Sequence, residues 1–382
     1  LLWKKFDITS IEVLKQACEA DALTTMKGFG LRLQVKLLAA IAFQAEHARD
    51  FYLDTALSVA QSWIEKLAPL QSISRIEPTG MLRRGDKLIQ SVELLIEANS
   101  SELISELNDK LECGLSDSTP LIIKDVSGLP VQLWVSTKES FTAQQLIRTG
   151  GEVYAEQLQS MYGTEAETAI QSLAQAGNAS LLTEEALCNS IGIQWIEPEL
   201  RDIYSHFPEE VELVETAEIK GAFHAHSTWS DGRNSLEELA EAARKIGYQY
   251  LGISEHSQAA YYANGLKPDR VKAQWDLIDQ LNGSYSDFHI FKGIEADILS
   301  DGSLDYDEEL LAGFDFVIAS IHSHFQLDSV KQTDRIVRAM QSPFTTILGH
   351  PTGRMLMARP GYNPDMPTII YVAAENDKLI EI

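Results

Sequence analysis

The second half of this sequence repeats one pattern: a short run rich in β-branched residues, then a polar turn, then a segment with helical periodicity. This order predicts a parallel α/β barrel, in which the carboxyl ends of all strands lie on one side. Side chains that are distant in sequence therefore converge at that side. The predicted strands are Ile219–Phe223, Tyr250–Ser254, His289–Ile294, Phe316–Ile321 and Thr345–Leu348.

Side chains able to bind a metal stand at or just beyond the ends of these strands. They are His224, His226, Asp231, His256, Glu295, His322 and His350. His224 and His226 are two residues apart on one strand, so both imidazoles point to the same face and can reach one ion. Asp231 follows in a Ser-Asp-Gly turn that can return its carboxylate to the strand end.

Coincidence is the alternative, because a lone histidine after a strand is more often a core or surface residue than a ligand. Five of the nine histidines, however, stand at predicted strand ends, which favours a metal centre. The mixed nitrogen and oxygen ligands suit Zn, Mn or Fe better than Ca or Mg alone, and Mg stays an alternative.

Five short motifs resemble, in order, those of the polymerase-and-histidinol-phosphatase (PHP) metal-dependent phosphoesterases. They are Phe223–Gly232, Ile253–Ser257, Gly293–Glu295, Ser320–Ser323 and Gly349–Arg354. Together with Asp301–Asp305, these motifs resemble the PHP domain at the carboxyl end of bacterial family X DNA polymerases. The similarity is strongest over residues 219–382.

The resemblance implies a pocket for up to three divalent ions that share seven protein ligands. The first ion is assigned to His224, His226 and Glu295, the second to Glu295, His322 and His350, and the third to Asp231 and His256. The family adds a late Asp and His on strands that would follow Ile382. The chain is therefore expected to be a segment of a longer protein, and within this segment only the middle ion is expected to keep all of its ligands.

Three further positions bear on this pocket. Arg354, four residues past His350, is expected to bind a phosphate oxygen, although a solvated loop arginine is equally compatible with the sequence. Ala222 and Glu255 depart from the family, which usually has an acidic residue and an aspartate there. Neither belongs to the ligand set, and His289 and His324 are expected to be structural.

The first half begins with a Gly-hydrophobe-Gly turn, Gly28-Phe29-Gly30, ahead of a helical pattern. Such a turn opens the second helix of a helix–hairpin–helix module, where backbone N–H groups bind a DNA phosphate. Gly28 and Gly30 are therefore candidate DNA-binding residues. A helical turn with a packing role alone is the alternative.

Residues 77–96 resemble the nucleotidyltransferase motif of family X polymerases and keep Gly80, Arg83, Arg84 and Gly85. The aspartates that hold two metal ions in the family fall instead on Ser91, Glu93 and Gln132. Two Mg ions about 3.5–4 Å apart need several carboxylate oxygens, and here only the carboxylate of Glu93 remains.

Another departure from the family lies in Arg148–Glu152. This segment resembles the family's nucleotide-binding turn, but it ends in an acidic residue where the family has a basic one. The chain carries 31 basic and 56 acidic side chains, a net charge of −25, and has no Lys or Arg between Arg148 and Arg201. Tight DNA binding by this segment is therefore not expected. The acidic excess could also serve solubility. We interpret the polymerase-like part as a retained scaffold without nucleotidyl transfer.

The sequence thus predicts an α/β protein in three parts. These are a helix–hairpin–helix segment at 1–45, an inactive nucleotidyltransferase-like α+β domain at 46–205, and a truncated PHP-type distorted barrel at 216–382, after a linker near 200–218. Cys18, Cys113 and Cys188 form no CxxC motif, as expected for reduced thiols, and no apolar stretch is long enough to cross a membrane. A cytoplasmic location is expected.

The favoured function is a metal-dependent phosphodiesterase on DNA with 3′ ends or gaps, either a 3′–5′ exonuclease or a nuclease that repairs 3′ ends or abasic sites. No membrane and no obligate protein partner are expected. One alternative is an active family X repair polymerase, which Ser91 and Gln132 oppose. Another is a small-molecule phosphomonoesterase of the histidinol-phosphatase type, and a non-enzymatic scaffold is the last.

Overall fold

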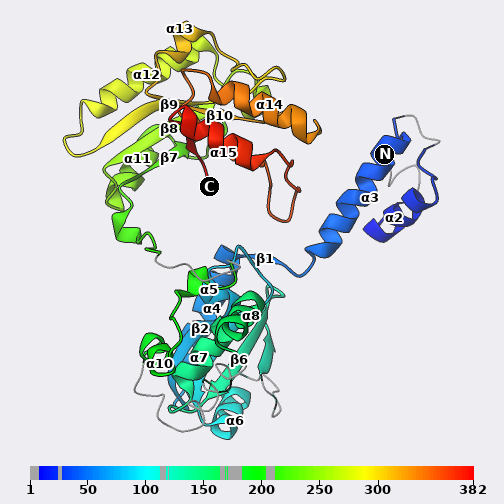
Figure 1. Cartoon of the computed structure of the whole chain (residues 1–382), viewed down its shortest axis with the longest axis vertical. Coiled ribbons are helices and arrows are strands. Elements are labelled where there is room, and N and C mark those ends of the chain that lie inside the picture. Colours follow the sequence, from blue (N-terminus) through cyan, green and yellow to red (C-terminus); the bar gives the residue numbers. More distant parts are fainter. Residues whose placement is uncertain are drawn as a thin grey trace. The chain divides into compact units, whose positions relative to one another are not determined.

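The computed structural model describes residues 8–24, 28–111, 118, 120–163, 168, 170, 183–203 and 211–382 (Figure 1). Met26, Lys27, Cys113 and residues 204–210 of the predicted linker lie outside these ranges. The chain divides into two compact units, Leu1–Val211 and Glu212–Ile382. Within the described ranges, no helix has the length and apolar character needed to span a membrane.

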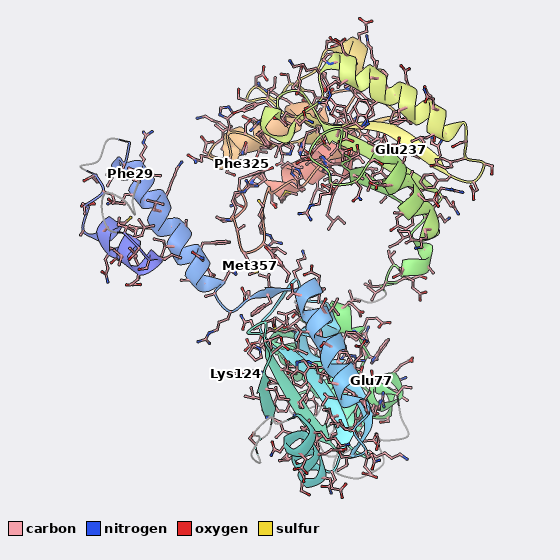
Figure 2. The ribbon with its side chains drawn as sticks, turned by 180° about the vertical axis from the view of Figure 1, so that it is seen from behind. Phe29, Glu77, Lys124, Glu237, Phe325 and Met357 are labelled. Carbon is pink, nitrogen blue, oxygen red and sulfur yellow. The ribbon has the colours of Figure 1, made fainter. Side chains whose placement is uncertain are left out.

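The described part of the first unit starts with helices α2 (Ile11–Glu19) and α3 (Leu31–Glu46). Ser10 caps α2 by accepting a hydrogen bond from the Val13 N–H at 3.2 Å. Gly28 has a φ of 94°, which glycine adopts readily, and Gly30 is the N-cap of α3. The turn between the helices carries Phe29, which packs on the small core of this helical pair (Figure 2).

A mixed four-stranded sheet follows, in the order β2-β4-β6-β5. Its central strands β4 and β6 are parallel, and the outer strands are antiparallel to their neighbours. Leu94, Leu95 and Ile96 of β4 are fully buried, as expected for the middle of a sheet that is covered on both faces. The strands are β2 (Ile73–Thr79), β4 (Val92–Ala98), β5 (Leu121–Lys124) and β6 (Pro130–Ser136), with a separate pair β1 (Phe51–Tyr52) and β3 (Leu88–Ile89).

The helices of this part form two cores. One lies under the sheet, and the other joins α7, α8 and α10 around Leu146, Tyr154 and Leu187. The helices are α4 (Leu53–Leu67), α5 (Gly80–Arg84), α6 (Ser100–Leu111), α7 (Phe141–Thr149), α8 (Glu152–Tyr162), α10 (Glu184–Ser190) and the 3-10 turn η2 (Pro198–Leu200).

The second unit is built on one six-stranded sheet in the order β12-β11-β10-β9-β8-β7, with every neighbouring pair parallel. The strands are β7 (Gly221–Ala225), β8 (Tyr250–His256), β9 (His289–Asp297), β10 (Phe316–Ser320), β11 (Ile347–Leu348) and β12 (Leu379–Ile380). The predicted α/β class with a parallel barrel-like sheet is confirmed. The sheet curls as an open part of a barrel (Figure 1).

Helices connect these strands and cover one face of the sheet (Figure 1). They are α11 (Leu236–Lys245), α12 (Pro268–Asn282), α13 (Glu308–Leu311), α14 (Ser329–Met340), α15 (Met366–Glu375) and the 3-10 turns η3 (Thr216–Glu218) and η4 (Tyr261–Ala263). Ser235 and Glu238 form a capping box at the start of α11. The helical period of Leu236, Leu239 and Ala243 predicts that Ile246 also faces the sheet. Ile246 is instead 67% exposed, because α11 ends one residue earlier.

Side chains alternate between the two faces of each strand. On β8, Leu251 and Ile253 pack under the helices, whereas Gly252 faces the inside of the curled sheet. The Phe316 ring lies against Gly252 and Gly293, where an added Cβ would come within 3 Å of it. Aromatic side chains thus fill the interior beside these two glycines, and the polar residues of the same face stand toward the carboxyl ends.

Candidate metal centre

All seven candidate ligands lie at the carboxyl edge of the curled sheet. His224, His256 and Glu295 belong to β7, β8 and β9, and His226 immediately follows β7. His322 and His350 come two residues after β10 and β11, and Asp231 lies in the turn after β7. The parallel topology therefore brings together the residues that the sequence analysis singled out.

Glu295 is the centre of this cluster and is only 1% exposed. Five imidazoles surround its carboxylate. The nitrogen-to-oxygen distances are 3.1 Å for His224, 3.6 Å for His226, 2.8 Å for His256, 3.1 Å for His322 and 2.8 Å for His350. Asp231 extends the cluster to one side, 3.3 Å from His226 and 3.6 Å from His256.

This donor set fits divalent cations. Three sets of residues each offer ligand atoms that lie within 4.8 Å of one another. The sets are His224, His226 and Glu295; His226, Asp231 and His256; and His256, Glu295 and His322. Among the described residues, Glu295 Oε2 and His256 Nδ1 have no partner with hydrogen-bond geometry although they lie 2.8 Å apart. A buried carboxylate surrounded by imidazole nitrogens is an environment that a divalent cation can occupy.

Two carboxylates orient His224 and His322 by contacting Nδ1, the ring nitrogen that does not face Glu295. Nδ1 of His224 lies 2.7 Å from Glu381 Oε1, and Nδ1 of His322 lies 2.6 Å from Asp297 Oδ1. A carboxylate on Nδ1 fixes the ring and directs the Nε2 lone pair toward a metal. Sequence reasoning missed both residues. Asp297 could have been found, since it stands two residues after Glu295 on the same face of β9.

Two candidate ligands have an unusual backbone. His224 has a φ of 63° and His350 a φ of 25°, in the left-handed region that residues other than glycine rarely adopt. Such conformations cost about 1–3 kcal/mol each and concentrate at functional sites. The Glu381 carboxylate helps to hold both residues, because its Oε2 also accepts a hydrogen bond from the His350 N–H at 2.7 Å.

The close packing of charges shifts the pKa values of this cluster. Burial would raise the pKa of Glu295, but contacts with His224 and its neighbours outweigh burial and hold the pKa far below its usual range. Burial lowers the pKa of His226 to about 4. For His224 and His322, burial acts downward too, but the neighbouring carboxylates prevail and raise each pKa to about 9.

Glu255, which departs from the family pattern, points away from the pocket and supports it from outside. It is fully buried and accepts hydrogen bonds from the backbone N–H groups of Ser227 and Ser230, both at 3.0 Å, and from both serine hydroxyls. Gln274 of α12 donates a further hydrogen bond at 3.1 Å. Glu255 therefore fixes the turn that carries Asp231. Ala222, the other departure, packs against the helix-side core.

Arg354 lies on the exposed loop after His350, and no described residue forms an ion pair or hydrogen bond with its side chain. Arg359 on the same loop is held in place, since its Nε and Nη2 donate to the Gly353 carbonyl at 3.1 and 2.8 Å and its guanidinium lies over the Phe325 ring. His289 is exposed at the start of β9, away from the carboxyl edge.

The polymerase-like site is organised around Glu93. This residue faces Gln132 in the register of β4 and β6, and Ser91 directly precedes β4. Trp134 Nε1 donates a hydrogen bond to Glu93 Oε2 at 3.0 Å, and the Arg148 guanidinium lies 3.5 Å from the Trp134 ring centre. Burial raises the pKa of Glu93. The one remaining carboxylate is thus held by an indole.

The two arginines of the motif beside this site, Arg83 and Arg84, form ion pairs and hydrogen bonds within the protein. Arg83 forms a two-point ion pair with Glu184 at 2.7 and 3.0 Å. Arg84 donates to the Thr149 carbonyl at 3.0 Å and to Asp86 at 2.6 Å. Asp202 accepts hydrogen bonds from the Val153 and Tyr154 N–H groups at 2.6 and 3.1 Å and so occupies the N-terminus of α8.

Comparison with known proteins finds similarity in the second unit and over the chain as a whole. The family model described as the PHP domain matches residues 222–356. The chain is 32% identical over 394 aligned residues to the DNA polymerase/3′-5′ exonuclease PolX of Bacillus subtilis, a match that covers 100% of this chain and 69% of that protein.

Two probable phosphatases match a smaller part. Those of Thermoanaerobacter sp. and Clostridium acetobutylicum are 29% and 32% identical over 171 and 165 residues, in each case 42% of this chain. The chain spans 59% and 62% of their lengths.

Proposed function

Because the chain belongs to the PolX family and carries a PHP domain in its second half, we propose that it is a metal-dependent phosphodiesterase acting on DNA with 3′ ends or gaps. The activity is that of a 3′–5′ exonuclease or of a nuclease that repairs 3′ ends or abasic sites. The observation that carries the proposal is the convergence of five histidines and Asp231 on the buried Glu295.

The three groups of ligand atoms around Glu295 would hold Mn, Zn or Fe, with Mg as the alternative. When bound, clustered divalent cations activate water for attack on phosphorus and neutralise charge on the ester. The chain itself orients the ligands through Glu381, Asp297 and Glu255. Arg354, exposed on the loop after His350, would bind a phosphate oxygen of the substrate.

The polymerase-like part is proposed to be silent. Glu93 alone replaces a set of carboxylates that two Mg ions require, and it already accepts a hydrogen bond from Trp134. Arg83 and Arg84, which the family resemblance assigns to this motif, bind Glu184 and Asp86. A nucleoside triphosphate would have to displace the carboxylates of Glu184 and Asp86 from these arginines.

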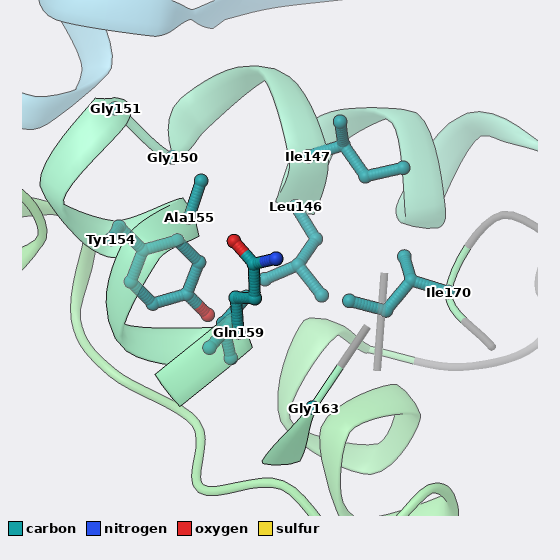
Figure 3. A pocket seen from close by; sticks show the side chains of 10 residues that line it. Leu146, Ile147, Gly150, Gly151, Tyr154, Ala155, Gln159, Gly163 and Ile170 are labelled. Atoms are coloured by element: carbon teal, nitrogen blue, oxygen red, sulfur yellow. The ribbon is translucent and has the colours of Figure 1, made fainter. Parts of the chain in front are cut away.

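The nucleotide-binding turn also supports a silent domain. Gly150 and Gly151 border a cavity of about 80 Å³ between α7 and α8, lined by Leu146, Tyr154 and Gln159 among others (Figure 3). Small-molecule sites usually measure about 300–1,000 Å³. The cavity at this turn is smaller than that range, and the adjoining helix N-terminus is filled by Asp202.

DNA is favoured as the substrate over a small phosphomonoester because the PolX relative aligns with all of this chain, whereas the probable phosphatases align with 42% of it. Gly28 and Gly30, at the turn before α3, would contribute a phosphate contact through their backbone N–H groups. We expect the protein to act in the cytoplasm.

The test uses a 5′-labelled primer on gapped duplex with Mn²⁺ and all four dNTPs. The unmodified protein is compared with His226→Ala, which removes a candidate ligand, and with His289→Ala, an exposed histidine away from the pocket. Shortening of the primer that only His226→Ala abolishes is the expected result. Lengthening would overturn the silent polymerase, and an intact primer with hydrolysis of p-nitrophenyl phosphate would identify a phosphomonoesterase.

A further inference from the structure

Two neighbouring tyrosines stand exposed on the loop after β8. Tyr261 is 86% exposed and Tyr262 is 62% exposed, and their rings meet edge to face with centres 6.0 Å apart. Isolated exposed aromatic residues are common, but two adjacent ones beside a candidate active site call for a ligand. The Tyr262 ring centre lies 6.4 Å from that of His256, one of the candidate metal ligands.

The loop itself is firmly held, so the exposure of the tyrosines is not a result of loose packing. Ala260, Ala263 and Leu266 are buried under it. Asn264 donates hydrogen bonds from its side chain to the carbonyls of the turn that carries Asp231, at 3.0 and 3.2 Å. The Ala259 N–H donates to Asp305 at 2.8 Å. The two rings are therefore presented to solvent in a fixed position.

The charges around Tyr262 place it at the rim of the metal pocket. Burial raises the pKa of its hydroxyl to about 12, and the carboxylates of Asp297 and Glu295 act in the same direction. Arg359 acts in the opposite direction, so a fixed cation also lies within electrostatic range of the hydroxyl. Carboxylates of the metal pocket and the Arg359 guanidinium are thus both within electrostatic range of the Tyr262 hydroxyl.

We propose that Tyr262, with Tyr261 beside it, forms a stacking platform for the terminal base of a single-stranded DNA 3′ end. This inference rests on the proposed function. Stacking on aromatic rings is the sequence-tolerant way to hold single-stranded DNA, and every base offers a face for it. It matters here because a chain of net charge −25 gains little from general attraction to phosphates.

The platform also accounts for selection of DNA by a pocket that otherwise recognises only a phosphate ester. A base stacked on Tyr262 would direct the adjoining phosphate toward His256 and Glu295, and Arg359 would neutralise a neighbouring phosphate. Substrates without a base would lack this contact.

The experiment measures binding of an oligodeoxynucleotide that ends in a 3′ 2-aminopurine nucleotide, joined by a phosphorothioate linkage and kept with Mn²⁺. Stacking quenches 2-aminopurine fluorescence. The variants are Tyr262→Ala, Tyr262→Phe, which keeps the ring, and Tyr371→Ala, a control with a similarly exposed tyrosine on α15.

Loss of quenching and about a tenfold higher Kd in Tyr262→Ala, restored by Tyr262→Phe and absent in Tyr371→Ala, are expected. The ratio of kcat/KM on single-stranded DNA to that on bis(p-nitrophenyl) phosphate should fall to a similar extent, mainly through KM. Equal quenching and Kd in Tyr262→Ala would overturn the platform while DNA hydrolysis by the unmodified protein upholds the proposed function. Absence of both DNA binding and DNA hydrolysis in the unmodified protein would overturn both.

Discussion

Glu381 Oε1 lies 2.7 Å from Nδ1 of His224, although the two residues are 157 positions apart in the sequence. The second oxygen of the same carboxylate accepts the His350 N–H, so one side chain directly after β12 fixes two candidate ligands on β7 and after β11. With Nδ1 engaged, Nε2 of His224 faces Glu295 at 3.1 Å, on the side where a metal would bind. Metal affinity should therefore depend on a residue that contacts no metal.

Replacing Glu381 by glutamine should lower the affinity for divalent metal by about 10- to 100-fold, because the ring of His224 loses its charged partner. Competition between the protein and a fluorescent chelator for Mn²⁺ or Zn²⁺ measures this affinity. Glu375→Gln, an exposed glutamate on α15, is the matched control and should leave it unchanged. The same affinity in both variants would refute an orienting role for Glu381.

Metal binding should release protons at pH 7.5. Since the pKa values of His224 and His322 are raised to about 9 in the metal-free protein, both rings are protonated at this pH and must lose a proton to become ligands. His226, whose pKa is lowered to about 4, is already neutral and releases none. Apparent metal affinity therefore rises with pH and levels off above about 9.

Calorimetric titration with metal in buffers of different ionisation enthalpy measures this release, and about two protons per protein are expected from the two raised pKa values. Glu381→Gln should reduce the number toward one, because His224 loses part of what raises its pKa. A binding enthalpy that is independent of the buffer would contradict the prediction.

The Glu255→Gln substitution should destabilise the second unit by about 1–3 kcal/mol. The amide would place N–H groups against the donors of Ser227, Ser230 and Gln274, which now all point to a carboxylate. Urea unfolding measures the change, with Glu241→Gln on the exposed face of α11 as a control expected within about 0.5 kcal/mol. Equal stability of the two variants would mean that the turn is held by other contacts.

The parallel sheet and the ligand cluster could be predicted because both depend on local signals. A β-branched run, a polar turn and a helical period are each visible within a few residues, and parallel topology then brings the strand ends together. His224 and His350 follow this rule, and the family resemblance agrees with the PolX match. Ile246 shows its limit, because the helical pattern does not fix the last residue of α11.

The supporting residues could not be predicted in the same way. Glu381 acts on His224 only because β12 pairs beside β11 and the sheet curls, and no short-range pattern records this. The role of Asp202 depends likewise on the chain returning to α8 from the region predicted to be a linker. The exposure of Tyr262 depends on hydrogen bonds from Asn264 and Ala259 to distant segments.

Removing the Asp202 carboxylate should loosen the start of α8. In Asp202→Ala, the Val153 and Tyr154 N–H groups lose their acceptor, at a cost of about 1 kcal/mol, which corresponds to about fivefold faster hydrogen exchange at these amides. Mass-spectrometric exchange of the peptide that covers α8 measures it. Unchanged exchange there would show that Asp202 does not cap the helix.

Restoring the three family carboxylates should not restore nucleotide addition. A Ser91→Asp, Glu93→Asp and Gln132→Asp variant regains metal ligands, but Arg84 still donates to Thr149 and Asp86, and Asp202 still fills the N-terminus of α8. The triphosphate therefore lacks its cationic partners. Primer extension with Mg²⁺ or Mn²⁺ and four dNTPs tests this in a His226→Ala background, where the expected nuclease cannot conceal new synthesis. Extension by the triple variant would show that the lost carboxylates alone silence the domain, and that the internal ion pairs yield to a nucleotide.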